Sequence, residues 1–152
     1  MDQCDAREAL EAKGLAVTEQ RLATLQKIFD MGCYFTAKEL HQALLSEKQV
    51  DLATVYRAVG LFEREGLVRY VGEIGNCRYY AKACIHNPPH AHFRCEKCGR
   101  LFCLRPFNFD DSKELISLAG EGFEVRRVTL MLEGLCAKCR KEQLINHEEG
   151  GK

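Results

Sequence analysis

The chain has 152 residues, with 22 Lys and Arg against 22 Asp and Glu, so its formal net charge is zero. This balance excludes a protein that binds nucleic acid through a globally positive charge, and any DNA contact must come from a local arrangement of side chains. The length suits one medium domain or two small ones.

The first ten residues, "MDQCDAREAL", are charged and lack the apolar core of a signal peptide, and no later apolar run is long enough to cross a bilayer. We therefore expect a cytoplasmic protein with no membrane contact. Nine cysteines, an odd number in a chain without an export signal, favour thiolates bound to metal over a disulfide framework.

The first half of the chain predicts helices over 6–13, 20–31, 36–47 and 51–66, from apolar residues at helical spacing. Thr36 and Glu39 are spaced as a capping box, which marks the start of the third helix. In the fourth helix, Asp51 is the expected N-cap and Gly66 the expected stop.

Residues 67–81 form two β-rich runs separated by Gly72, Gly75 and Asn76, a pattern typical of a β-hairpin. Helices followed by a hairpin indicate a winged helix-turn-helix, in which the helix over 51–66 would read DNA. Its face away from the core carries small residues and side chains that reach bases and phosphates: Ala53, Thr54, Tyr56, Arg57 and Arg64. A small helical domain with an ordinary solvated face remains an alternative.

In the second half, Pro88 and Pro89 break regular structure and indicate a hinge. Strands are predicted over 92–95, 100–104 and 123–134, and a helix over 110–122, capped by Asp110 or Asp111. The expected fold is α+β, with a DNA-binding domain over 1–82, a hinge with metal ligands over 83–93 and an α/β domain over 94–152. Exposed strands in that last domain need a partner, which favours a homodimer.

Two C-x-x-C pairs stand in the second half, "CEKC" and "CAKC". Each pair places two sulfurs at adjacent corners of a tetrahedron, and two pairs complete a closed structural zinc site. The predicted ligands are Cys95, Cys98, Cys136 and Cys139. A redox dithiol is the alternative for a single C-x-x-C pair.

The stretch "CIHNPPHAHFRCEKC" holds further candidate ligands. His90 and His92 project to the same side of an extended segment, and Cys84 and Cys103 could converge on them. Sulfur and nitrogen ligands in tetrahedral number favour zinc over iron or manganese. Buried free thiols and surface histidines are the alternative. A thiol enzyme lacks a recognisable base and orienting group, so no enzymatic activity is expected.

In order along the chain, "TEQR", "FTAKEL", "ATVYRAVGLFEREGLV", "HAHFRCEKCGRL", "GFEV" and "GLCAKC" resemble the ferric uptake regulator (Fur) superfamily of metal-dependent repressors. The resemblance implies a homodimer that binds a palindromic operator in double-stranded DNA when its sensor site is filled, with no small-molecule substrate. It lends a DNA-contacting role to Tyr56 and Arg57 beside Ala53 and Thr54, and places Arg21 near the DNA backbone.

The sensor site departs from the iron and peroxide branches, which carry a His before the "TAxEL" motif and a carboxylate before the His cluster. Here Cys33 and Tyr34 stand at the first place, and Ala83 and Cys84 at the second. A Cys ahead of H-x-H resembles the zinc uptake regulators (Zur), although Arg69 stands where those proteins often have an Asp or His ligand.

The predicted regulatory ligands are therefore Cys84, His90, His92 and Cys103, with Glu73 or His86 as fallback for Cys103. A further family site is expected to be absent or weak, because Pro89, Ala91 and Val128 take its ligand positions and only Asp110 is left.

The expected function is zinc-responsive repression of zinc uptake genes, with a structural and a regulatory zinc. An iron, manganese or peroxide regulator of the same family is the main alternative, and a thiol redox protein or a zinc-stabilised interaction module is a distant one.

Overall fold

The computed structural model describes residues 4–84, 86–106 and 113–149. The chain divides into two compact units, Met1–Pro88 and Pro89–Lys152, and each is described by itself. The division falls inside the segment 83–93, for which the two prolines predict a hinge. No helix in the described parts has the length and apolar character to span a membrane.

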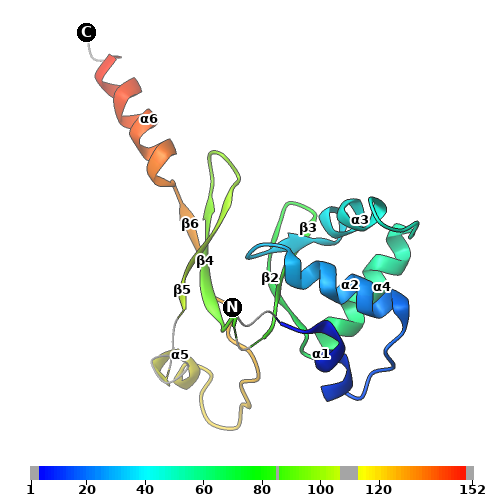
Figure 1. Ribbon diagram of the computed structural model, residues 1–152. Helices are drawn as coiled ribbons and strands as arrows, with labels where there is room; N and C mark the ends of the chain where they lie inside the picture. The colour runs from blue at the N-terminus through cyan, green and yellow to red at the C-terminus, as the bar shows by residue number, and fades with distance from the viewer. Residues whose placement is uncertain (1–3, 85, 107–112, 150–152) are drawn as a thin grey trace. The chain divides into compact units, whose positions relative to one another are not determined.

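The first unit contains four helices and a small antiparallel sheet (Figure 1). The helices are α1 (Ala6–Ala12), α2 (Glu19–Asp30), α3 (Ala37–Leu45) and α4 (Leu52–Arg64). The strands are β1 (Phe35–Thr36), β2 (Val68–Ile74) and β3 (Cys77–Lys82), in the order β1-β3-β2. This is the predicted winged helix: the β2–β3 hairpin follows α4 directly. The two-residue strand β1 lacks a sequence signal of its own.

Side-chain caps fix where the helices begin. The Thr36 hydroxyl accepts a hydrogen bond from the Glu39 N–H while the Glu39 carboxylate accepts one from the Thr36 N–H, so the predicted capping box is present. Asp51 accepts from the Thr54 N–H and caps α4. Gly66, with φ of +74°, follows the end of α4, in the backbone region that glycine adopts most easily.

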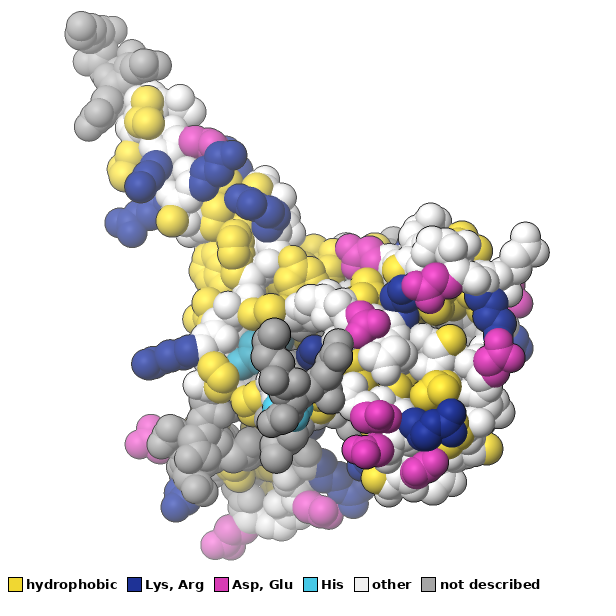
Figure 2. Space-filling model, in the orientation of Figure 1, with side chains coloured by type: hydrophobic (Ala, Val, Ile, Leu, Met, Phe, Trp, Pro, Cys, Tyr) yellow, Lys and Arg dark blue, Asp and Glu magenta, His cyan; other side chains and the backbone are white. Residues whose placement is uncertain are grey.

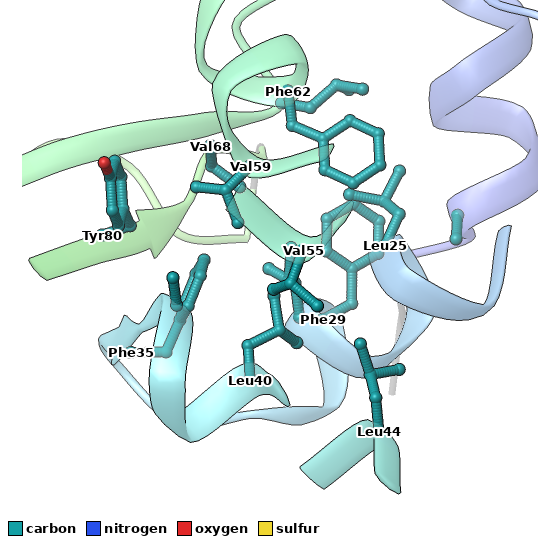
Figure 3. Packing of buried hydrophobic residues seen from close by; sticks show 14 of the residues in the cluster. Leu25, Phe29, Phe35, Leu40, Leu44, Val55, Val59, Phe62, Val68 and Tyr80 are labelled. Carbon is teal, nitrogen blue, oxygen red and sulfur yellow. The ribbon is translucent and has the colours of Figure 1, made fainter. Parts of the chain in front are cut away.

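The core of the first unit lies between the helices and the sheet (Figure 3). Its largest members are less than 2% exposed, among them Leu25, Phe35, Leu40, Val55 and Phe62. They come from α2, β1, α3 and α4, so burying them fixes α4 against the rest of the unit. The opposite face of α4 is left to solvent.

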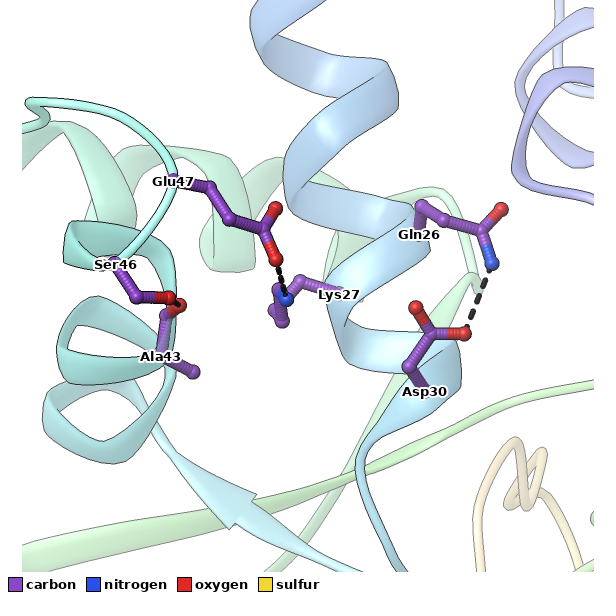
Figure 4. A network of polar contacts seen from close by, with 6 residues as sticks. All are labelled: Gln26, Lys27, Asp30, Ala43, Ser46 and Glu47. Carbon is purple, nitrogen blue, oxygen red and sulfur yellow. Dashed lines mark hydrogen bonds and ion pairs between the residues drawn. The ribbon is translucent and has the colours of Figure 1, made fainter.

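Polar contacts tie α2 to the end of α3 on the surface (Figure 4). Lys27 on α2 forms an ion pair with Glu47, and Ser46 donates a hydrogen bond to the Ala43 carbonyl 2.9 Å away. Within α2, Gln26 donates to Asp30 at 3.1 Å. Exposed contacts of this kind add at most about 1 kcal/mol each, so the core and the caps dominate the fold.

The second unit is built on a three-stranded sheet in the order β5-β4-β6. Strand β4 (His90–Cys95) is antiparallel to β5 (Leu101–Pro106) and parallel to β6 (Met131–Gly134). The helices are α5 (Lys113–Ser117) and α6 (Ala137–Glu149). An α/β unit was predicted here, and the helix α5 lies within the predicted range 110–122; its expected caps Asp110 and Asp111 lie outside the described residues.

The long strand predicted over 123–134 is wrong for most of its length, because only Met131–Gly134 joins the sheet. A strand needs a neighbour that supplies hydrogen bonds, and β6 pairs with β4 from His92 onward. The chain before His90 includes Pro88 and Pro89, which have no N–H to donate to a ladder. Alternation of apolar residues therefore predicts a longer strand than the pairing supports.

Helix α6 begins directly at the second C-x-x-C pair and was not predicted. Yellow hydrophobic and dark blue basic side chains are interspersed along it (Figure 2), and residues 140–146 are all exposed. A helix that is not amphipathic depends on contacts at its ends or on a partner. In the described residues, the buried contact of α6 is Cys139, in its first turn.

Candidate metal centres and DNA-binding helix

The four predicted structural ligands come together at one end of the sheet of the second unit. Cys95 is the last residue of β4, and Cys98 lies in the turn to β5, where Gly99 adopts a φ of +71°. Cys136 and Cys139 lie between the end of β6 and the first turn of α6. Strand pairing of β4 with β6 therefore carries both C-x-x-C turns to the same place.

The four sulfur atoms all lie within 4.8 Å of one another. Sγ of Cys98 is 3.9 Å from Sγ of Cys136, and two sulfurs that each lie about 2.3 Å from one tetrahedral zinc are about 3.8 Å apart. Cys95, Cys136 and Cys139 are buried, packed by Phe93, Phe102 and Leu135. The donor set and its spacing fit a closed Cys4 zinc site.

The electrostatics of this cluster call for a cation. Hydrogen bonds from the backbone N–H groups of Cys136 and Cys98 lower the pKa of Cys95 to about 6, while burial raises the pKa of Cys139 to about 12. Neighbouring thiolates repel one another, so in the absence of a positive ion they cannot all ionise. A divalent metal bound by these four cysteines would keep all of them as thiolates, and its binding would add to the folding free energy of the unit.

A second group of ligand atoms lies at the other end of the same strands. The side chains of His90, His92 and Cys103 place ligand atoms within 4.8 Å of one another. His92 is 3% exposed and lies opposite Cys103 across β4 and β5, and the His90 and His92 rings are 4.5 Å apart. A register shift between His90 and His92 interrupts the ladder at this point. The three residues form two nitrogen donors and one sulfur donor.

The fourth predicted regulatory ligand, Cys84, belongs to the first unit, and its place in the regulatory site stays a prediction. It follows β3 in a turn closed by a hydrogen bond of 3.0 Å from the Asn87 N–H to the Cys84 carbonyl. The fallback ligands Glu73 and His86 are both exposed. Among the described residues, neither is grouped with His90 and His92 in a candidate metal cluster.

Cys4 is a residue for which the sequence predicted no role. Its Sγ lies 2.7 Å from Sγ of Cys84, although 80 positions separate them in the chain. Burial and the neighbouring Cys84 thiol raise the pKa of Cys4 to about 11. The cysteine count is the signal that could have indicated a role for Cys4, because neither the C-x-x-C pairs nor the predicted regulatory ligands include it.

The predicted DNA-contacting residues of α4 lie on its solvent face. Tyr56 is 49% exposed, Arg57 and Ala53 are exposed, and Thr54 is half-buried. Arg57 donates a hydrogen bond from Nη2 to Oγ1 of Thr54, 3.1 Å away, and the Thr54 hydroxyl donates to Asp51 at 2.9 Å. Hydrogen bonds from the Thr54 N–H and hydroxyl hold the pKa of Asp51 below its usual value. The chain of contacts orients Arg57 from the N-terminus of the helix.

Arg21 lies beside the same face, in α2. Its Nη1 donates to the Ala16 carbonyl at 3.2 Å. Together with Arg57 it lines a surface hollow of about 310 Å³ between the start of α2 and α4. Two guanidinium groups line this one hollow, in a unit whose residues 1–88 carry 11 Lys and Arg against 12 Asp and Glu. Side chains of this kind are able to contact phosphates.

Comparison with known proteins gives a consistent family. The model of the ferric uptake regulator family matches residues 12–133. The chain is 29% identical over 146 residues to the peroxide operon regulator of Bacillus subtilis strain 168, covering 94% of this chain and 95% of that protein.

Among solved structures, the chain is similar to the Vibrio cholerae ferric uptake regulator, with a TM-score of 0.67 and 28% identity over 87% of this chain and 100% of that chain. A zinc uptake regulator complexed with zinc and DNA matches with a TM-score of 0.63 over 91% of this chain and 93% of that chain. Its identity of 24% is evidence of a shared fold alone.

Proposed function

The chain belongs to the ferric uptake regulator family, whose members are metal-responsive transcriptional regulators and not enzymes, and on this premise we propose that it is a zinc-responsive repressor. As a homodimer, it binds a palindromic operator in double-stranded DNA when its regulatory site holds zinc. The genes that it represses are those for zinc uptake.

The proximity of His90, His92 and Cys103 is the main observation in favour of zinc. Its ligand atoms lie within 4.8 Å of one another, and one of them is sulfur. Thiolate and imidazole together suit zinc, whereas manganese prefers carboxylate and water oxygens. Adding the Cys84 sulfur completes a tetrahedral set of two nitrogens and two sulfurs.

Cys84 connects metal binding to DNA binding in this proposal. It stands in the unit that carries α4, while the other three ligands stand in the sheet unit. A shared ion favours one arrangement of the two units, and DNA binds that arrangement better. A coupling free energy of roughly 1–3 kcal/mol would change operator affinity about 5- to 150-fold.

The exposed face of α4 supplies the DNA contacts. Tyr56 and Arg57 contact bases and phosphates, Ala53 and Thr54 allow close approach, and Arg21 contacts the backbone of the DNA. In a dimer, two such helices enter successive major grooves about 34 Å apart.

Homodimer formation is supported by the apolar surface of the second unit. Several of its large hydrophobic side chains are 45–80% exposed: Leu115, Leu118, Phe123, Leu132, Leu144 and Ile145. Its buried core in the described residues is small and consists largely of cysteine. A second copy of the chain would cover this surface and the strands at the sheet edges.

A peroxide-responsive regulator is the second candidate, because the B. subtilis relative that matches nearly the whole chain is named for peroxide. The ligand set separates the two candidates. A regulator that reacts with peroxide through iron needs oxygen and nitrogen ligands, and Cys103 and Cys84 replace oxygen ligands in the proposed site.

The test is a metal competition on anaerobically purified full-length protein, with DNA binding as the readout. Chelator-treated protein is titrated with zinc, manganese or iron(II), and binding is measured to a duplex selected from a random library. We expect two zinc per chain, one of them removable, and DNA binding that returns with zinc. Preferential refilling and activation by iron or manganese would overturn the zinc assignment and favour the second candidate.

A further inference from the structure

Cys4 and Cys84 form a thiol pair in which only Cys84 has a role in the proposed function. Their sulfur atoms are 2.7 Å apart and both residues are partly buried. Cys4 stands directly before Asp5, the N-cap of α1, and packs against the core of the first unit. Both partners therefore belong to the same unit.

The distance between these sulfurs distinguishes two kinds of cysteine pair. Sulfurs bound to one tetrahedral zinc are about 3.8 Å apart, and Cys98 and Cys136 match this at 3.9 Å. Cys4 and Cys84 are more than 1 Å closer, at 2.7 Å, nearer to the bonded distance of about 2.05 Å in a disulfide. The pair is therefore placed for a sulfur–sulfur bond rather than for sharing one ion.

Asn87 forms hydrogen bonds beside Cys84. Asn87 donates from its N–H to the Cys84 carbonyl at 3.0 Å and from Nδ2 to the Lys82 carbonyl at 2.6 Å. Its own carbonyl accepts from Nη2 of Arg69 at 2.8 Å. These contacts constrain the backbone that carries Cys84, whose sulfur lies 2.7 Å from that of Cys4.

Two cations face the pair. Arg69 interacts electrostatically with Cys84, and its buried Nη1 finds no hydrogen-bond acceptor among the described residues. Lys82 interacts electrostatically with Cys4, and its Nζ is held by the Phe29 carbonyl at 2.9 Å. Lys82 offsets only part of the effect of burial and of the Cys84 thiol, which raise the pKa of Cys4 to about 11. The proximity of the two sulfurs therefore carries the argument.

We propose that Cys4 and Cys84 are a site of reversible oxidation by hydroperoxides, forming an intramolecular disulfide. The Cys84 sulfur attacks one peroxide oxygen and the O–O bond breaks. The departing oxygen takes the Cys84 proton and leaves as an alcohol, or as water when the peroxide is hydrogen peroxide. Cys84 is then a sulfenic acid. The Cys4 sulfur displaces its hydroxyl, which leaves as water with the Cys4 proton. Two thiols and one hydroperoxide give a disulfide, an alcohol and water, and with hydrogen peroxide they give a disulfide and two waters.

The consequence for DNA binding rests on the proposed function. If Cys84 is a regulatory ligand, the disulfide removes its sulfur from the metal site, and the oxidised protein loses one zinc and its operator. Reduction by a thiol restores both. The chain would then respond to hydroperoxide as well as to zinc, through residues separate from the four-cysteine site.

Tryptic peptide mapping tests the disulfide directly, because trypsin sites leave each thiol in question on its own peptide. Cys4 lies on residues 1–7, Cys33 on 28–38, Cys77 on 70–78 and Cys84 on 83–94. Reduced full-length protein, freed of removable metal, is treated with one equivalent of hydrogen peroxide, alkylated and digested without reductant. We expect a linked peptide of 1–7 with 83–94 that dithiothreitol separates.

Matched variants complete the test. Cys4→Ser is expected to abolish the linked peptide while keeping zinc-dependent DNA binding, and Cys33→Ser and Cys77→Ser to leave the linkage intact. Linkages through Cys33 or Cys77, or oxidation of Cys84 without Cys4, would overturn the proposed pair. The same treatment is then applied to zinc-loaded protein, with zinc content and operator affinity measured afterwards. A linked peptide in zinc-loaded protein that keeps all its zinc and its operator affinity supports the disulfide and overturns Cys84 as a regulatory ligand.

Discussion

His92 on β4 and Cys103 on β5 are direct cross-strand partners, and their ligand atoms lie within 4.8 Å of each other. Because the two strands are hydrogen-bonded, the backbone holds this nitrogen and this sulfur together before any ion arrives. Ligands that the backbone already holds together lose less conformational entropy when the ion binds. His90, on the same strand, adds the third donor.

Replacing Cys103 by Ser is expected to weaken zinc binding at the regulatory site. Losing even an outer-shell partner of a metal costs about 10- to 100-fold in affinity, and losing a direct ligand should cost at least that much. The affinity is measured by competition with a colorimetric zinc chelator. Cys77→Ser, a half-buried thiol on β3, serves as the matched control. Wild-type affinity in Cys103→Ser, with loss in Glu73→Gln or His86→Ala, would show that a fallback ligand is the fourth donor.

Replacing Cys136 by Ser is expected to unfold the second unit and dissociate the dimer while the first unit stays folded. Three of the residues that form the buried core of the second unit are cysteines of the proposed zinc site, so losing the ion removes that core. All five tyrosines, at 34, 56, 70, 79 and 80, lie in the first unit and report on it separately.

Tyrosine fluorescence should therefore keep its wild-type thermal transition in this variant, while circular dichroism and size-exclusion chromatography show lost structure and a monomer. Cys33→Ser, an exposed thiol of the first unit, is the control. A dimeric Cys136→Ser protein with native dichroism would rule out the structural role of the site.

The sequence predicted the first unit well because its signals are local. Caps such as Thr36 and Asp51 act within a few residues, and the structure has them where the pattern placed them. The hairpin turns at Gly75 and Asn76 as predicted, whereas Gly72 lies inside β2 at a register shift and does not separate the strands. The two C-x-x-C pairs are local signals of the same kind. Their meeting in space needs only the pairing of β4 with β6.

The structural features that the sequence did not predict depend on contacts between segments that are distant in the chain. The strand predicted over 123–134 is only four residues long in the structure, because its pairing with β4 runs from His92 to Cys95 and β4 itself begins at His90, after Pro88 and Pro89. The two-residue strand β1 exists only because Phe35 and Thr36 meet Tyr80 and Tyr79. The Cys4–Cys84 contact joins residues 80 positions apart, and no spacing rule connects them.

Removing the capping box is expected to destabilise the first unit selectively. Thr36→Ala deletes a side-chain acceptor for a helix N–H, which costs about 0.5–2 kcal/mol. Urea unfolding followed by tyrosine fluorescence should show a lower midpoint. Ser46→Ala, at the exposed end of α3, is the matched hydroxyl deletion and should change little. An unchanged midpoint in Thr36→Ala would mean that the packing of Ala37 and Leu40 alone fixes the helix start.

The lowered pKa of Asp51 predicts that the stability of the first unit falls at acidic pH. The pKa of Asp51 is lowered in the folded state. Its ionised form therefore stabilises the fold fully at pH values above its unfolded pKa of about 3.9. This contribution is lost as the pH falls through the lower pKa of the folded state. Asp51→Asn keeps the acceptor but lacks the charge at the start of α4. The difference in urea midpoint between wild type and Asp51→Asn should be present near neutral pH and shrink toward about pH 3. A constant difference would mean that the charge contributes nothing.

Replacing Arg57 by Ala is expected to weaken zinc-dependent binding to the selected duplex about 5- to 150-fold, since one such contact is worth about 1–3 kcal/mol. Zinc content and tyrosine-detected stability should not change. Arg57 is exposed, is oriented by Thr54 and lines the hollow that Arg21 shares. Arg126→Ala removes an exposed guanidinium from the second unit and is the charge-matched control. Fluorescence anisotropy across a range of salt concentrations measures both affinity and its salt dependence.

The salt dependence and an Arg57→Lys variant together separate the two kinds of DNA contact. If Arg57 binds a phosphate, its loss lowers the slope of log affinity against log salt by about one, and Lys restores most of the affinity. If it binds a guanine edge with both nitrogens, Lys fails and discrimination between duplexes relaxes, because a point charge does not reproduce the paired donors. Arg57→Ala protein that still binds the duplex as tightly as Arg126→Ala would show that α4 does not present this face to DNA.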